Sequence, residues 1–250
     1  MEKIKDLCTT DNLLLGLAAL GAYKLAVSPA LSLLGGIYKN FLRPRLNFKK
    51  RYGENSWALI TGATNGIGLG FAEELAKEGF NLVLVGRSTD KLLKCKVELE
   101  KKFPERQIET RKLDLMSTDV QDYIDLGDSV AELDISILVN NAGYANLCPL
   151  DDEEYSELER MIKTNIGPYV YLTRSILPRM LKREKKSGII FTSSVAAFLP
   201  LPCLSTYAAT KAFNNHFSLS LAFENVDKVD VLSFAPNAVA TAMNGRKPSF

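Results

Sequence analysis

Apolar segments of strand length alternate with segments of helix length along most of this chain, from residue 56 to residue 236. Parallel strands need long crossover connections, usually helices, which cover both faces of the sheet. The alternation therefore predicts an α/β fold with a doubly wound parallel sheet. The expected strands are residues 56–61, 81–86, 107–115, 135–143, 187–194 and 228–236, and the expected helices are residues 69–80, 89–103, 117–133, 153–185 and a last one from Ser205.

The amino-terminal part of the chain does not follow this pattern. Residues 13–38 carry one charge, on Lys24, and are long enough to cross a bilayer core of about 30 Å. A basic tract follows, made of Arg43, Arg45, Lys49, Lys50 and Arg51. By the positive-inside rule, this tract places the next domain on the cytoplasmic face of a membrane.

We therefore expect a membrane-anchoring helical segment with its basic tract in residues 1–52 and a folded domain in residues 53–250. Two alternatives stay open for the apolar segment. It is either an amphipathic or re-entrant hairpin broken at Pro29, or a segment that targets the protein to mitochondria.

Charge and rare residue types give no support to nucleic-acid or metal binding. The 31 basic and 29 acidic residues nearly balance, with a net charge of +2. The four cysteines lie far apart without a CxxC pair, and His216 is the only histidine. We expect reduced thiols, no metal site and no nucleic-acid partner.

A glycine-rich turn, TGATNGIG at residues 61–68, lies between the first expected strand and the first expected helix. Glycine lets the backbone approach a pyrophosphate closely, and the helix amino terminus offers free N–H groups to it. Together with the strand that follows, the turn predicts a Rossmann-like dinucleotide site. The candidate cofactor-binding residues in this turn are Gly62, Thr64, Asn65, Gly66, Ile67 and Gly68.

The end of the second expected strand carries Arg87 where NAD-selective sites usually place a carboxylate. An arginine pairs well with a 2′-phosphate, so the sequence favours NADP(H) over NAD(H). The alternative is that Arg87 is an ordinary surface side chain. Asp114, after the third expected strand, is either an acceptor for the adenine amino group or a helix cap shared with Ser117.

Tyr207 and Lys211 lie four residues apart and therefore share one face of the expected helix. A neighbouring ammonium favours the phenolate, so we expect Lys211 to lower the pKa of Tyr207 and to make it a proton donor near neutral pH. Ser194 ends the fifth expected strand, at the sheet edge where ligands of such folds bind, and could hold a carbonyl oxygen. Ser193 is the second candidate for that role.

These motifs together resemble the short-chain dehydrogenase/reductase family. The family's glycine turn matches Thr61, Gly62, Gly66 and Gly68, its NNAG segment matches Asn140, Asn141, Ala142 and Gly143, and its catalytic set matches Asn165, Ser194, Tyr207 and Lys211. The resemblance implies that Tyr207 donates a proton, Lys211 assists it and binds the nicotinamide ribose, and Ser194 polarises the carbonyl. It also implies that Asn141, Ala142, Gly143 and Tyr207 contact the cofactor, and that Asn165 holds a water for proton relay. The alternative for Asn165 is a backbone bridge at an irregularity near Gly167 and Pro168.

Longer stretches of the chain look like one membrane-bound branch of that family. These stretches are residues 42–68, 81–92, 199–213 and 236–250. The branch comprises very-long-chain 3-oxoacyl-CoA reductases and related 17-beta-hydroxysteroid dehydrogenases. The resemblance implies reduction of the 3-keto group of an acyl-CoA with NADPH during fatty-acid elongation, in the endoplasmic reticulum membrane with a cytosolic catalytic domain. A steroid or another lipid-like carbonyl is the alternative substrate.

The carboxyl-terminal part departs from the family pattern at two places. Asn237 follows Pro236 where many members have glycine, although Val239 and Thr241 still fit the segment that touches the nicotinamide carboxamide. The family continues past a position equivalent to Phe250 with a lid and a seventh strand, which this sequence lacks. We expect either part of a longer chain or a shortened relative. The second case admits a non-catalytic structural subunit of a membrane assembly, and a homodimer is also compatible with the resemblance.

Overall fold

A computed structural model describes residues 18, 21, 23–42, 44, 46–237 and 239. The chain divides into two compact units, Met1–Leu46 and Asn47–Phe250. In the first unit, helix α3 (Ser28–Ile37) lies between two π-helical turns, Tyr23–Val27 and Tyr38–Leu42. The backbone passes through Pro29 in helical conformation, so the hairpin broken at this proline is not present. Within the described residues, no helix combines the length and the apolar character needed to cross a membrane.

The second unit contains the predicted parallel sheet. In the described part of the chain it has six strands: β1 (Trp57–Thr61), β2 (Asn81–Gly86), β3 (Ile108–Lys112), β4 (Ile135–Asn140), β5 (Ser187–Thr192) and β6 (Val229–Phe234). Their order is β3-β2-β1-β4-β5-β6, and all neighbouring pairs are parallel. The predicted fold class is therefore confirmed for the sheet. The order reverses between β1 and β4, which in such sheets is where a ligand crevice forms at the carboxyl ends of the strands.

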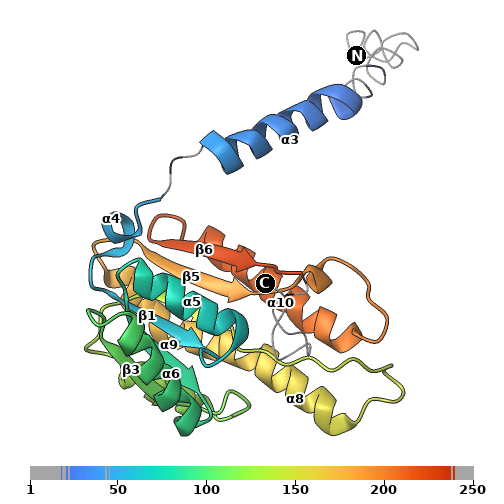
Figure 1. The fold of residues 1–250 in the computed structure, drawn as a ribbon. Helices are drawn as coiled ribbons and strands as arrows, with labels where there is room; N and C mark the ends of the chain where they lie inside the picture. Colours follow the sequence, from blue (N-terminus) through green and yellow to red (C-terminus); the bar gives the residue numbers. More distant parts are fainter. Residues whose placement is uncertain are drawn as a thin grey trace, which may run out of the picture. The chain divides into compact units, whose positions relative to one another are not determined.

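Helices cover both faces of this sheet, as Figure 1 shows. They are α4 (Phe48–Tyr52), α5 (Gly66–Lys77), α6 (Thr89–Lys102), α7 (Val120–Asp128), α8 (Tyr155–Asn165), α9 (Gly167–Lys182) and α10 (Ser205–Glu224). Alternate residues of each central strand enter different cores because successive strand side chains point to opposite faces. Leu59 and Val83 pack with α7, α9 and α10, whereas Ile60 and Leu84 pack with α5 and α6.

One predicted element is wrong. The sequence suggested a single helix over residues 153–185, but the structure has α8 and α9 with a break at Ile166, whose φ and ψ are −112° and −61°. Proline at the start of α9 has no N–H to continue the hydrogen bonds of α8. The N–H of Tyr169, which would bond the carbonyl of Asn165 in a continuous helix, donates to Ile166 at 3.2 Å, and the carbonyl of Asn165 accepts from the side chain of Asn214 at 2.9 Å. The break fixes the direction in which Asn165 faces the sheet edge.

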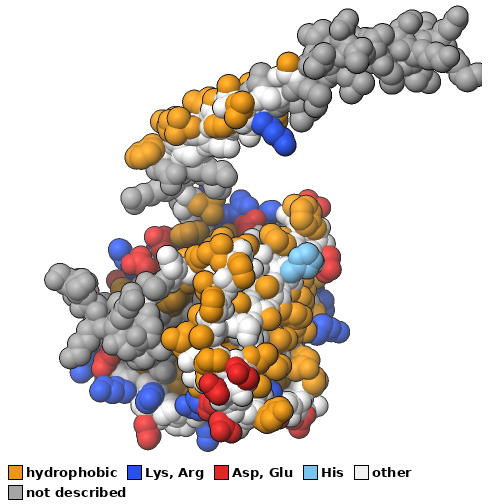
Figure 2. Space-filling model, turned by 90° about the vertical axis from the view of Figure 1, so that its right-hand side faces the viewer, with side chains coloured by type: hydrophobic (Ala, Val, Ile, Leu, Met, Phe, Trp, Pro, Cys, Tyr) orange, Lys and Arg blue, Asp and Glu red, His pale blue; other side chains and the backbone are white. Residues whose placement is uncertain are grey.

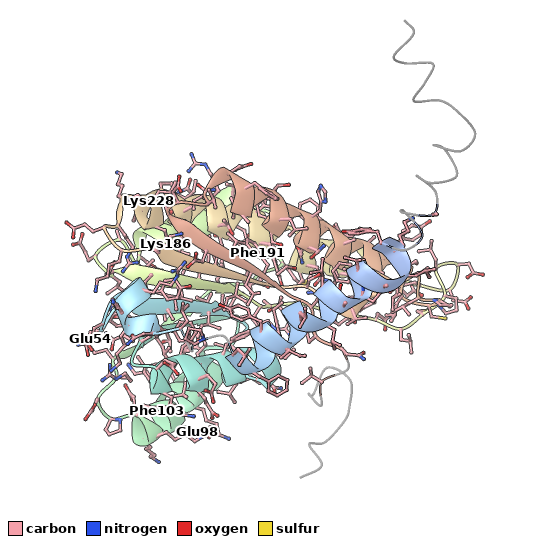
Figure 3. The ribbon with its side chains drawn as sticks, turned by 90° about the horizontal axis from the view of Figure 1, so that it is seen from above. Glu54, Glu98, Phe103, Lys186, Phe191 and Lys228 are labelled. Carbon is pink, nitrogen blue, oxygen red and sulfur yellow. The ribbon has the colours of Figure 1, made fainter. Side chains whose placement is uncertain are left out.

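The short helix α4 is part of the folded domain, although residues 47–52 were expected to belong to the basic tract. Arg51 forms two hydrogen bonds with the carboxylate of Asp230, at 2.5 and 2.6 Å. The hydroxyl of Tyr52 donates to the same carboxylate at 2.9 Å, and its ring is buried. Figure 3 shows Lys186, which approaches Asp230 at 3.5 Å, at the end of the domain where the strands begin.

Replacing Asp230 by asparagine should lower the free energy of unfolding by about 1–3 kcal/mol at pH 7, the usual worth of hydrogen bonds to charged groups. Burial alone would raise the pKa of Asp230, but the bonds from Arg51 and Tyr52 and the charges of Arg51 and Lys186 hold it below its usual value. The contribution is therefore present above the pKa of the unfolded state and lost as the pH falls through the folded pKa. Urea unfolding at pH 7 and at pH 3 measures it.

Glu54→Gln is the matched control for this measurement. Its carboxylate pairs with Lys49 at 3.7 Å, but both side chains are largely exposed. Such surface pairs contribute about 0–1 kcal/mol. Equal effects of the two substitutions at pH 7 would contradict the role assigned to Asp230.

Candidate active site

The glycine-rich turn lies where the sequence placed it, between β1 and α5. Gly62 and Gly66 have φ angles of 64° and 55°, a region that favours glycine. A Cβ atom on Gly68 would lie 2.2 Å from the carbonyl oxygen of Gly62. The cap residue Asn65 makes no side-chain bond to the helix, so it leaves the first N–H groups of α5 without a side-chain cap, and Asn65 itself lines the neighbouring cleft. The turn thus has the form that a phosphate group requires.

Asn141 holds this turn against the end of β4. Its side-chain amide donates to the carbonyl oxygens of Thr61 and Gly62, at 3.1 and 3.5 Å, and its oxygen accepts from Thr192 at 3.4 Å. Asn141 therefore ties β1 and β5 together at the sheet edge. The neighbouring Ala142 is buried, and its Cα lies 3.1 Å from where a Cβ on Gly62 would be. Both residues support the turn from behind.

A cleft of about 500 Å³ opens beside the turn. It is lined by Thr64, Asn65, Arg87, Ser88, Lys91, Gly143, Tyr144 and Ala145. Arg87 is exposed, and its guanidinium makes no hydrogen bond or ion pair with the described residues. The ammonium of Lys91, which lines the same cleft, likewise has no partner among the described residues. Two uncompensated cations at the mouth of a cleft favour an anionic ligand.

The other predicted cofactor residues lie less centrally. Asp114 is exposed, and its carboxylate accepts from the N–H of Met116 at 3.0 Å. It does not cap α7, because the cap of that helix is Asp119. Val239 is 40% exposed, and Thr241 lies outside the described residues. Ile67 lies in the first turn of α5 beside Gly66 and Gly68.

Tyr207 and Lys211 occupy one face of α10, as their spacing predicted. The ammonium nitrogen of Lys211 lies 5.7 Å from the centroid of the Tyr207 ring. A Cβ on Gly143 would lie 3.2 Å from the same nitrogen, so the pair adjoins the cleft. Ser194 follows β5, and its side chain forms a hydrogen bond with Tyr207.

The expectation that Lys211 lowers the pKa of Tyr207 is wrong. Burial raises the pKa of Tyr207 above 10.0, and only the hydrogen bond with Ser194 lowers it. The ammonium of Lys211 points to the carbonyl oxygen of Thr192, at 2.9 Å, rather than to the phenol oxygen. Burial of Lys211, which is 3% exposed, lowers its pKa to about 8. Tyr207 is therefore a protonated phenol at neutral pH, as a proton donor must be.

The structure separates the two candidate serines. Ser193 is 1% exposed, and its hydroxyl donates to the backbone oxygen of Lys211 at 2.9 Å. That hydrogen bond connects the end of β5 to α10, and the Ser193 hydroxyl therefore has no proton left to donate to a substrate. Ser194 is partly exposed, and its side chain is the one in contact with Tyr207. Ser194 is thus the serine that a substrate oxygen could reach.

Asn165 acts as a bridge. Its amide nitrogen donates to the carbonyl oxygen of Tyr144 at 2.8 Å and to the hydroxyl of Thr210 at 3.0 Å, so both amide hydrogens are used. Its oxygen accepts from the N–H of Tyr144 at 2.8 Å. This geometry agrees with the bridging alternative, while the role of holding a water stays a prediction.

Four residues at or beside the cleft were not predicted. Ser88 caps α6, and Lys91 lies one helical turn further. Tyr144 also lines the cleft, and the Arg160 guanidinium stacks 3.8 Å from the centroid of its ring. A basic residue one turn after a strand-end arginine was a usable signal for Lys91. Tyr144 follows the NNAG segment directly, but its stacking depends on α8, which no local pattern places there.

A glycine turn at a helix amino terminus, beside a protonated phenol and a buried lysine on a parallel sheet, defines a nucleotide-dependent oxidoreductase of the doubly wound class. The chain belongs to the short chain dehydrogenase family, because the sequence model of that family matches residues 56–249. Two proteins named very-long-chain 3-oxoacyl-CoA reductase are similar to it. The one from Podospora anserina is 36% identical, with 91% of this chain and 67% of the relative covered. The human one is 41% identical, with 79% and 64% covered.

Solved structures show the same fold with bound nucleotides. A short chain dehydrogenase of Shigella flexneri complexed with NADP is 25% identical, with a TM-score of 0.72 over 78% of this chain and 82% of the other. A short-chain dehydrogenase of Sphingobium yanoikuyae in complex with NADPH is 30% identical, with a TM-score of 0.69 over 75% and 73%. The fold of this chain is therefore the one found in these short-chain dehydrogenases.

Proposed function

We propose that this protein uses NADPH to reduce the 3-keto group of a long-chain 3-oxoacyl-CoA. The main observation behind the proposal is that Tyr207, Ser194 and Lys211 lie close together. They adjoin Gly143, which lines the same cleft as Arg87. The names of the similar fungal and human proteins support the substrate class. The nucleotides in the similar solved structures support the cofactor.

The cleft fits such a nucleotide. Gly68 has no room for a Cβ because Gly62 and Asn141 pack against it, so the turn lies directly on the first turn of α5, whose N–H groups can meet a pyrophosphate. Arg87 and Lys91 offer positive charge to a 2′-phosphate, and no carboxylate lines the cleft. Gly143 connects this cleft to the catalytic side chains because it borders both the cleft and the ammonium of Lys211.

Each residue of the site has a separate role in the proposed carbonyl reduction. NADPH, when bound, supplies the hydride that reaches the carbonyl carbon. Tyr207 gives its phenolic proton to the carbonyl oxygen, and Ser194 orients that oxygen by hydrogen bonding. Lys211 keeps positive charge near the phenol as negative charge develops there. Asn165 keeps the backbone of Tyr144 in place at the wall of the cleft.

Turnover with defined carbonyl substrates tests the proposal. The purified protein in detergent or lipid should oxidise NADPH in the presence of a long-chain 3-oxoacyl-CoA, with little activity on 17-keto steroids. Faster turnover of the steroid would assign the protein to the steroid alternative. Tight NADPH binding without reduction of either class would support the structural-subunit alternative.

Arg87→Gln should raise the KM for NADPH about tenfold to a hundredfold, because hydrogen bonds to a charged phosphate contribute about 1.5–3 kcal/mol. The KM for NADH should change little, since NADH lacks the 2′-phosphate. Initial rates at varied concentrations of each cofactor give the two KM values. Arg174→Gln, at an exposed position of α9, is the matched control. An equal rise in the KM for both cofactors would contradict a contact with the 2′-phosphate.

The amino-terminal segment supports a proposal about location. Several apolar side chains of its described part are exposed, among them Leu25, Leu31, Leu33 and Leu34. We propose that this segment attaches the protein to the endoplasmic reticulum with its catalytic domain in the cytosol, and mitochondria are the alternative membrane. Fractionation with protease protection distinguishes the two. A homodimer or a place in a membrane complex stays a prediction.

A further inference from the structure

Two cysteines that the proposed reaction does not use lie next to each other in space. Cys148 belongs to the irregular segment between β4 and α8, and Cys203 to the segment just before α10. The backbone N–H of Cys148 donates to the carbonyl oxygen of Cys203 at 3.0 Å. Both segments lie at the end of the sheet towards which the strands point (Figure 1).

The backbone geometry suits a covalent link between these residues. The backbone hydrogen bond places the two residues side by side. Burial raises the pKa of Cys148, and the thiols are near enough for the charge of Cys203 to raise it further. Disulfides are formed by residues whose Cα atoms lie about 4.4–6.8 Å apart. Cys203 has a φ of 63°, which is uncommon outside glycine and holds its chain in a tight turn. Both residues are free thiols in the structure.

We propose that Cys148 and Cys203 form a reversible disulfide, with a small disulfide such as oxidised glutathione as the oxidant. This modification site joins the segment after β4 to the segment before α10. Cys95, by contrast, is 5% exposed and lies on the buried face of α6.

The exposure of the two thiols sets the order of the exchange. Cys203 is exposed, so its thiolate attacks one sulfur of oxidised glutathione and releases one glutathione thiolate. Cys148 is partly buried, and its thiolate then attacks the sulfur of Cys203 and releases the second glutathione. The two protein thiols lose two electrons and two protons, and oxidised glutathione is reduced to two glutathione molecules. Burial, with the carboxylates of Glu153 and Asp152, raises the pKa of Cys148, so the second step is faster at mildly alkaline pH.

The two joined segments begin and end at the proposed active site. The segment with Cys148 starts after Gly143, whose Cβ position lies 3.2 Å from the ammonium of Lys211. The segment with Cys203 leads into the first turn of α10, which carries Tyr207. A link between them restrains both sides of the carboxyl edge, where ligands of such sheets enter. If the proposed reduction is correct, the disulfide slows entry of the acyl-CoA but leaves nucleotide binding unchanged.

Mass spectrometry of the full-length protein tests the link without reference to activity. The protein is incubated with oxidised glutathione at pH 8, alkylated and digested without reduction. The expected product is a linked pair of peptides containing Cys148 and Cys203, which dithiothreitol separates. Cys148→Ser should instead retain a glutathione adduct on Cys203, and Cys95→Ser should behave as the wild type. A stable glutathione adduct on wild-type Cys203, or unmodified thiols, would overturn the proposal.

A kinetic measurement then tests the consequence. The oxidised wild type should lose roughly tenfold in kcat/KM for the 3-oxoacyl-CoA, as expected when loop motion limits access. Dithiothreitol should restore it, and Cys148→Ser should show no loss. NADPH binding, followed by fluorescence, should be equal in both redox states. Unchanged turnover in a protein shown to carry the link would overturn the gating role, while the modification site would stand.

Discussion

Tyr207→Phe should reduce the rate of carbonyl reduction about a hundredfold to ten-thousandfold, the usual contribution of a positioned general acid. The substitution removes the phenolic proton and leaves the ring, which lies 5.7 Å from the ammonium of Lys211. Burial raises the pKa of this phenol, so the wild type holds its proton through neutral pH. Stopped-flow or steady-state oxidation of NADPH with a 3-oxoacyl-CoA measures the loss.

The NADPH affinity of this variant separates chemistry from folding. Because Tyr207 is not among the residues that line the cleft, its dissociation constant for NADPH should stay within about threefold of the wild type. Tyr155→Phe, at a side chain that is 88% exposed at the start of α8, is the matched control and should keep full activity. A Tyr207→Phe enzyme that reduces the substrate at the wild-type rate would remove the basis of the proposed mechanism.

Local sequence patterns were sufficient for the sheet and the turn. The strands were predictable because strands of a parallel sheet covered on both faces are short continuous apolar runs, which stand out between helix-length segments, and the glycines of residues 61–68 required a tight turn before a helix. The break between α8 and α9 was harder. Apolar periodicity continues across it, and only the pair Gly167–Pro168 marked the irregularity.

The electrostatics of the site could not be predicted from spacing alone. Residues four apart on a helix were correctly placed on one face, but the direction of the Lys211 ammonium depends on β5. Its carbonyl at Thr192 accepts the ammonium, and Tyr169 approaches it from α9 at 5.5 Å. The choice between Ser193 and Ser194 likewise depends on a contact across two elements, the bond from Ser193 to the backbone of α10. Contacts of this kind are long-range, and no local pattern carries them.

The exposed apolar side of α10 likewise could not be predicted from local sequence patterns. Phe213, Leu219 and Phe223 are 40%, 48% and 85% exposed, and hydrophobic side chains are numerous on the face of the domain shown in Figure 2. The sequence of α10 mixes apolar and polar residues around the helix. Which of its sides is covered by the sheet follows from β5 and β6, not from the helix itself.

Lys211→Met should abolish most of the reductase activity and, at the same time, raise the free energy of unfolding by up to about 3 kcal/mol at pH 7. The ammonium is buried among Thr192, Tyr169 and Tyr207 with no carboxylate partner among the residues that the structure describes, and burial lowers the pKa of Lys211 to about 8. Below pH 8 both folded and unfolded states carry the proton, so the folded state bears the whole cost of burying the charge. Methionine has nearly the same length and removes that cost.

The pH dependence distinguishes this cause from better packing. As the pH rises from 8 to 10.5, the folded wild type releases its proton before the unfolded chain does, so the stability of the wild type rises towards that of the variant. The gain from Lys211→Met should therefore shrink over this interval, as measured by urea unfolding at pH 7, 9 and 10.5. Lys77→Met, at an exposed lysine of α5, should change stability by no more than about 0.5 kcal/mol at each pH. A gain from Lys211→Met that is the same at every pH would show that the ammonium is not the source of the cost, and a loss at pH 7 would show that its bond to Thr192 outweighs its burial.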